Sequence, residues 1–203
     1  MTRIYSLATP HLRFVVGPLL LAAVFTVDAQ TKKPVTSWPQ EPTTFLGLKF
    51  NVSLESQLPA CGTAEVNASH AMCYRKPLSH RTVLENLPDL GVPITSAAVL
   101  SFVGKPGIVS VEVPQAASHF MLQALENRYG PPHQTVLLDI KPANPTSNRA
   151  TSYRWKGPRI EISFSTDAGG YIEGAMLTVS SREVLKAAGD VYDADTRKAA
   201  QKL

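Results

Sequence analysis

The fold class is decided first by residues 97–113, which read AAVLSFVGKPGIVSVEV. The segment GKPG in its middle predicts a turn, because its two glycines tolerate positive φ and its proline fixes its own φ. After the turn the residues alternate, with Val109, Val111 and Val113 on one face of an extended chain. The stretch therefore predicts a β-hairpin with one apolar face.

A helix is predicted directly after the hairpin, over residues 115–129. Gly130 suits a left-handed helix C-terminus, and Pro131 cannot continue the helix. The apolar side chains recur at steps of three and four residues and form one stripe that ends in an arginine stem: Ala117, Phe120, Met121, Ala124, Leu125 and Arg128.

Further strands are predicted on both sides of this hairpin and helix. Short Gly- and Pro-containing turns between them favour antiparallel pairing. The order predicts an α+β domain in two layers, an antiparallel sheet of about five to six strands packed by one main amphipathic helix. The additional strands are expected at residues 45–50, 134–140, 153–164 with a break at 157–158, and 171–179.

A resemblance supports this fold class. The stretch LENRYGPP at residues 125–132, followed by WKG at residues 155–157, resembles a helix end and sheet found in small exported bacterial domains, including the BamE-like and β-lactamase-inhibitor-like modules. The likeness extends over residues 97–180. It implies an α+β fold and carries no functional residue over to this chain.

The first 29 residues have the pattern of a secretory signal peptide. Arg3 and Arg13 supply positive charge, and a mainly apolar run of 14 residues follows over 14–27. Small side chains at Val27 and Ala29 suit cleavage before the next residue. The alternative is a membrane anchor, but a span needs roughly 20 apolar residues. We therefore expect a periplasmic or secreted protein with no transmembrane anchor after cleavage.

Four parts of the chain are predicted. Residues 1–29 form the signal peptide, and residues 30–44 form a flexible Pro-rich leader. Residues 45–181 form a single α+β domain. The 44% hydrophobic content of the full chain is too high for a disordered protein. Residues 182–203 form a C-terminal tail that is helical or frayed, with the helix expected to end near Gly189.

Cys61 and Cys73 are the two cysteines of the chain. In an oxidising compartment such a pair usually forms a disulfide, and this is our prediction. A redox role is one alternative. A zinc site is another, since His70 and His80 lie at C-x8-H-x2-C-x6-H spacing. We predict neither a metal nor a cofactor, because an oxidised pair supplies no thiolates.

Catalytic motifs are missing from the sequence. No G-x-S-x-G or H-E-x-x-H motif occurs, and the glycine pairs lie in hairpin turns and not in a phosphate-binding loop. Glu161 and Glu173 lie on neighbouring predicted strands, where alternation points both outward. No catalytic residue is assigned. A net charge of +4 over 203 residues disfavours nucleic-acid binding.

The candidate binding residues are Tyr153, Arg154, Lys156 and Arg159, which surround the turn at residues 157–158. A cationic, aromatic turn suits an anionic partner. We predict an exported, non-catalytic interaction module of the bacterial envelope or extracellular space, with a protein or an anionic envelope component as partner. The alternatives are an inhibitor of a secreted hydrolase and an enzyme whose site the sequence does not reveal.

Overall fold

The structure is a computed structural model. It describes residues 37–63, 66, 69–75, 81–138, 150–167 and 174–200. They belong to one compact unit, Pro34–Leu203. The predicted signal peptide lies outside the described residues, as do residues 30–36 of the predicted leader.

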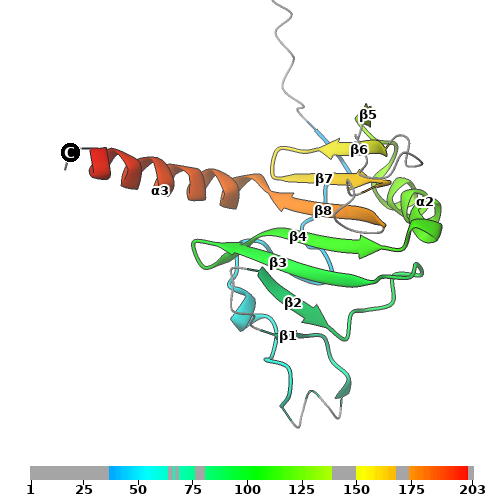
Figure 1. Ribbon diagram of the computed structural model, residues 1–203, viewed down its shortest axis with the longest axis horizontal. Coiled ribbons are helices and arrows are strands. Elements are labelled where there is room, and N and C mark those ends of the chain that lie inside the picture. Colours follow the sequence, from blue (N-terminus) through cyan, green and yellow to red (C-terminus); the bar gives the residue numbers. More distant parts are fainter. Residues whose placement is uncertain are drawn as a thin grey trace, which may run out of the picture. The chain divides into compact units, whose positions relative to one another are not determined.

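One antiparallel sheet of eight strands forms the centre of this unit (Figure 1), in the order β1-β2-β3-β4-β8-β7-β6-β5. It consists of two four-stranded meanders that join where β4 pairs with β8. The α+β class and the antiparallel sheet are confirmed. The strands are β1 (Cys73–Arg75), β2 (Arg81–Glu85), β3 (Ser96–Phe102), β4 (Lys105–Val113), β5 (Gln134–Leu138), β6 (Ala150–Lys156), β7 (Ile160–Ser165) and β8 (Ala175–Ser181).

The predicted number of five to six strands is too low. Strands β1 and β2 contain three and five residues, which is too short for alternation to distinguish them from a loop. The predicted strand at residues 45–50 is instead a tight turn, in which Phe45 and Leu48 form an isolated bridge. The left-handed φ values of Leu46 and Gly47, 51° and 78°, close this turn.

The hairpin of β3 and β4 is confirmed, but its turn lies earlier than predicted. Phe102 pairs with Lys105, which leaves Val103 and Gly104 as a two-residue loop with φ values of 51° and 73°. Two positive φ angles match the twist of paired strands. A register shift after Leu100 accommodates the proline within β4.

The core lies on one face of the sheet. The predicted helix over 115–129 is present as a short 3-10 turn, η2 (Gln115–Ala117), followed by α2 (Ser118–Tyr129). Helix α2 buries Met121, Leu125 and Tyr129, whereas Phe120 of the predicted stripe is exposed. Apolar residues that precede the sheet share this core, with one more from the 3-10 turn η1 (Leu54–Ser56): Trp38, Phe45, Leu46, Leu48, Phe50 and Leu54.

The C-terminal end of α2 is closed by the indole groups of the two tryptophans. Trp38 donates from Nε1 to the Tyr129 carbonyl oxygen at 3.0 Å, and Trp155 donates from Nε1 to the Gly130 carbonyl oxygen at 2.7 Å. The last carbonyls of a helix lack partners within it. These two bonds therefore satisfy the helix end and tie it to the segment before the sheet and to β6.

Helix α3 (Arg182–Ala200) follows β8 directly. It begins where the Ser181 hydroxyl oxygen accepts the Val184 N–H at 3.3 Å. The predicted interruption at Gly189 does not occur. An internal glycine costs only about 1 kcal/mol, and the Lys186–Asp190 ion pair, 2.9 Å long, bridges it. None of the helices in the described ranges combines the length and apolarity needed to span a membrane.

Candidate binding site

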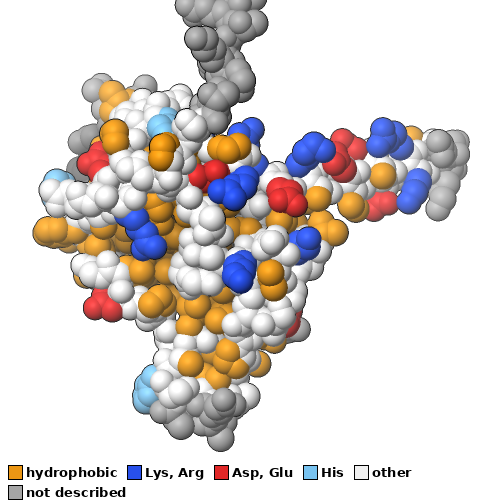
Figure 2. Space-filling model, turned by 180° about the vertical axis from the view of Figure 1, so that it is seen from behind, with side chains coloured by type: hydrophobic (Ala, Val, Ile, Leu, Met, Phe, Trp, Pro, Cys, Tyr) orange, Lys and Arg blue, Asp and Glu red, His pale blue; other side chains and the backbone are white. Residues whose placement is uncertain are grey.

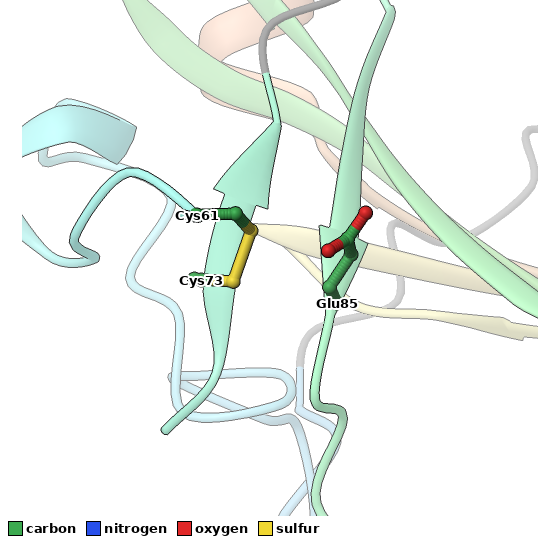
Figure 3. Close-up of side chains that lie close together, drawn as sticks. All are labelled: Cys61, Cys73 and Glu85. Atoms are coloured by element: carbon green, nitrogen blue, oxygen red, sulfur yellow. A yellow bond between two sulfur atoms is a disulfide. The ribbon is translucent and has the colours of Figure 1, made fainter. Parts of the chain in front are cut away.

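The predicted disulfide between Cys61 and Cys73 is confirmed (Figure 3). It holds residues 59–61 along the outer edge of β1. There the Cys61 N–H donates to the Tyr74 carbonyl oxygen at 2.9 Å, and the Tyr74 N–H donates to the Pro59 carbonyl oxygen at 3.1 Å. The bridge therefore closes one edge of the sheet, which is a structural role.

Two of the four residues of the alternative zinc site are bonded to each other. Both sulfur atoms are in the disulfide, so they supply no thiolates in this structure. Glu85 lies beside them (Figure 3), and its carboxylate accepts from Arg75 Nε at 2.7 Å. His70 is exposed, and His80 lies outside the described residues.

The four predicted binding residues do not share one surface. Tyr153 lies on the core side of β6 and stacks on Phe164, with ring centroids 6.4 Å apart. Arg154 and Lys156 lie on the opposite face, because side chains alternate along a strand. Arg159 lies in the turn after β6 and is 62% exposed.

On the open face of β6, the two cations have different neighbours. Arg154 lies between Gln134 of β5 and Ser163 of β7 in the ladder; its Nε is buried and has no hydrogen-bond partner among the residues described. Lys156 lies opposite Glu161 of β7. These neighbours leave the open face of β6 with mixed charge.

Arg159 contributes to a different feature, a cavity of about 450 Å³. Three parts of the chain bound it: residues 42–51, the start of β7 and the start of α3. Its apolar lining includes Phe50, Ile160 and Val184, which are all buried. Its charged lining consists of Lys49, Arg159 and Glu183. The cavity therefore combines an apolar floor with a charged rim.

Glu41 anchors the first wall of this cavity. Its carboxylate Oε1 accepts the backbone N–H groups of Arg159 and Ile160, both at 2.7 Å, and Oε2 pairs with Arg159 Nε at 3.3 Å. A side chain on Gly157 would overlap this carboxylate. Residues 37–44 of the predicted leader thus pack on the β6–β7 turn.

Side-chain and backbone bonds fix the other two walls. The Gln57 amide accepts the Lys49 N–H at 2.7 Å and donates to the Lys49 carbonyl oxygen at 2.9 Å. Arg182, the first residue of α3, donates its N–H to the Arg159 carbonyl oxygen at 2.8 Å and its Nη1 to the Gly157 carbonyl oxygen at 3.0 Å. The cavity is therefore held in shape by the chain itself.

The charges of the cavity are only partly balanced. The carboxylate of Glu41 engages one edge of the Arg159 guanidinium, which has five N–H donors in all. Across the described parts of the chain, no ion pair joins Lys49 or Glu183 to another residue. The cavity thus offers free cationic donors, with one carboxylate on the α3 wall.

Of the four predicted binding residues, Arg159 lines this cavity, whereas Glu41 and Lys49 were not predicted. Glu41 and Lys49 precede Arg159 by more than a hundred positions. The sequence contains no local pattern that links them, because only tertiary packing brings them together.

Among the groups that the structure describes, Tyr129 has a pKa that departs from its ordinary value. Burial raises the pKa of its phenol, and the neighbouring Arg128 partly opposes this. Tyr129 belongs to the closed end of α2 and not to the cavity. It therefore affects stability and not the site.

Comparisons of this chain with protein-family models, with curated proteins and with solved structures found no match. The resemblance to BamE-like and β-lactamase-inhibitor-like modules stays a prediction.

Proposed function

We propose that this protein is an exported, non-catalytic binding module of the bacterial envelope or extracellular space, and that its cavity holds an anionic group of its partner. One observation carries the proposal: Lys49 and Arg159 border a preformed cavity of about 450 Å³ with a buried apolar floor. Ligand-binding pockets commonly enclose about 300–1,000 Å³.

The cations favour an anionic ligand over a neutral one. Guanidinium groups donate paired, charge-assisted hydrogen bonds to carboxylate and phosphate oxygens. Lys49 adds a compact charge from another wall, and Gln57 holds its backbone. Because Glu41 already engages the Arg159 guanidinium and Gln57 fixes the Lys49 backbone, part of the site is ordered before binding, which lowers the ordering cost of the complex.

The disulfide supports the exported location. Disulfides persist mainly in oxidising compartments such as the periplasm and the extracellular space, and Cys61 and Cys73 form one. Together with the signal-peptide pattern of residues 1–29, this makes a partner in the envelope or outside the cell the natural choice.

The test is a titration of the ¹⁵N-labelled protein with inorganic phosphate, in which NMR records the amide chemical shifts at each phosphate concentration. We expect progressive, saturable shifts at Asn51, Ile160 and Val184, which line the cavity. The variant Lys49→Gln should weaken phosphate binding by roughly 1.5-fold to fivefold, the range for one exposed ion pair.

Lys156→Gln is the matched control, because it makes the same change on the open face of β6. It should leave the titration unchanged. Shifts spread over the whole surface, or the same phosphate affinity in Lys49→Gln and the wild type, would reject the cavity as the anion site.

A further inference from the structure

Helix α3 packs on the domain only through its first turns. Its 19 residues span about 28 Å at 1.5 Å per residue. Val184 is buried against the β3–β4 hairpin at Gly107. Farther along, Val191 is 49% and Tyr192 is 73% exposed. Figure 1 shows α3 extending away from the sheet, and Figure 2 shows apolar side chains exposed along it.

The distal half of α3 needs more stabilisation than its own sequence provides. Helices in proteins are held mainly by packing of an apolar face, and short isolated helices are marginal in water. Gly189, Asp190 and Asp193 have low helix propensity. The exposed ion pairs Lys186–Asp190 and Asp195–Lys198 add only about 0.2–0.5 kcal/mol each. A packing partner would supply what is missing.

A suitable face is present on the helix. Ala187, Val191, Ala194 and Lys198 recur at steps of four, three and four residues, which is the spacing of a helix–helix seam. Its two alanines allow close approach of another helix. At the first turns of α3, residues 183–187, here called its root, this face continues into a notch of about 130 Å³. The notch is bordered by Val103, which is 61% exposed.

The charges along α3 of one copy complement those of a second α3 that runs antiparallel to it. The root carries Glu183 and, in the same notch, Lys105; neither forms an ion pair with another residue in the described ranges. The distal end carries Asp195 and Lys198. An antiparallel pair of α3 helices brings Lys198 of one copy to Glu183 of the other, and Asp195 to Lys105. A parallel pair would bring like charges together.

We propose that α3 pairs antiparallel with α3 of a second copy of this chain, with each distal half seated on the root of the other helix. The two-fold symmetry makes every contact occur twice. A membrane surface suits this helix less well. Its polar side carries Asp190 and Asp193 beside Lys186 and Arg197, whereas surface-seeking helices have a basic polar side. The pairing does not rest on the anion site, although Glu183 and Val184 line both the notch and the cavity.

Sedimentation equilibrium of the purified protein over a range of concentrations tests the pairing. We expect a reversible monomer–dimer equilibrium. Val191→Asp places a charge in the centre of the seam and should give a monomer throughout the range. Circular dichroism and the urea midpoint should show that the sheet domain of this variant stays folded, because Val191 is 49% exposed and does not belong to the described hydrophobic core.

A charge exchange then tests the direction of the helices. Lys198→Glu places like charges together and should weaken the dimer by roughly tenfold, since two symmetric pairs change. The double variant Glu183→Lys/Lys198→Glu should restore it. Arg197→Glu makes the same charge change one residue away, about 100° around the helix axis, and it should have little effect.

Three results would overturn the proposal. The first is a wild-type protein that stays monomeric at all concentrations. The second is a dimer that Val191→Asp leaves intact. The third is a double variant that is no tighter than Lys198→Glu alone. A monomer that binds vesicles of phosphatidylglycerol through α3 would assign the helix to a membrane surface instead.

Discussion

At the scale of single residues, indole N–H groups close the end of α2. The carbonyl oxygens of Tyr129 and Gly130 accept from Trp38 and Trp155, and both indoles are buried. A buried acceptor that loses its donor keeps its desolvation cost. Each tryptophan is therefore required for its hydrogen bond as well as for its volume.

Trp38→Phe removes one donor and keeps an aromatic ring. We expect the free energy of unfolding to fall by about 1–3 kcal/mol, the cost of leaving a buried acceptor unsatisfied, measured by urea unfolding. Phe120→Leu, at an exposed position of α2, should change stability by less than about 0.5 kcal/mol. Equal effects of the two changes would contradict this role of the indole.

Tyr129 makes stability depend on alkaline pH. Burial raises the pKa of its phenol above the ordinary value of 10.0, so the folded state binds this proton more tightly than the unfolded state. Its stabilising contribution is complete below the unfolded pKa and is lost as the pH rises through the folded pKa.

We therefore expect the wild-type free energy of unfolding to fall more steeply above pH 10.0 than that of Tyr129→Phe. The other tyrosines occur in both proteins and cancel in the difference. Urea unfolding at several alkaline pH values measures the two slopes. Parallel curves would show that this phenol does not titrate differently on folding.

At the scale of elements, the β3–β4 hairpin and α2 could be predicted because their signals are local. Alternating valines mark β4, and Gly130 with two prolines marks the end of the helix. Residues 37–51 could not be placed in the same way. Leu46, Leu48 and Phe50 alternate like a strand but lie in and beside a tight turn. The segment is held by groups far along the chain, such as the Tyr129 carbonyl oxygen and the β6–β7 turn.

The residues of the candidate site also come together through long-range packing, which local sequence signals do not predict. Arg159 was recognisable from its position in a turn, whereas its grouping with Tyr153, Arg154 and Lys156 assumed that neighbours in sequence share a surface. Strand alternation separates them across the two faces of β6. The cavity instead joins Arg159 to Lys49, and the sequence contains no signal for this pairing.

Glu41→Gln tests how the segment before the sheet is attached. The carboxylate accepts two backbone N–H groups and an arginine N–H, and hydrogen bonds to charged groups contribute about 1.5–3 kcal/mol. We expect a stability loss of about 2 kcal/mol in urea, together with weaker phosphate binding at the cavity. Glu126→Gln on the exposed side of α2 is the control. An unchanged urea midpoint in Glu41→Gln would contradict this attachment.

At the scale of the whole molecule, the disulfide closes one edge of the sheet and limits the unfolded chain. Bridging cysteines 12 positions apart stabilises by about 3 kcal/mol in the chain-entropy model. Cys61→Ser/Cys73→Ser should lower the free energy of unfolding by that amount, measured by urea unfolding without reductant. A double variant as stable as the wild type would show that the disulfide does not stabilise the folded protein.

The protein is proposed to be exported and to bind its partner through the cavity, and one experiment in living cells addresses both proposals. A photo-crosslinking amino acid is placed at Asn51, which lines the cavity, and in a second strain at Thr178, on the open face of β8. The two positions report on different surfaces of the same exported chain.

Irradiation should give a discrete adduct in the envelope or extracellular fraction from position 51 and none from position 178, and Lys49→Gln should reduce the adduct. The opposite result is equally clear. A protein found in the cytosol, or an adduct formed from position 178 and not from position 51, would contradict an exported module that binds its partner through the Lys49–Arg159 cavity.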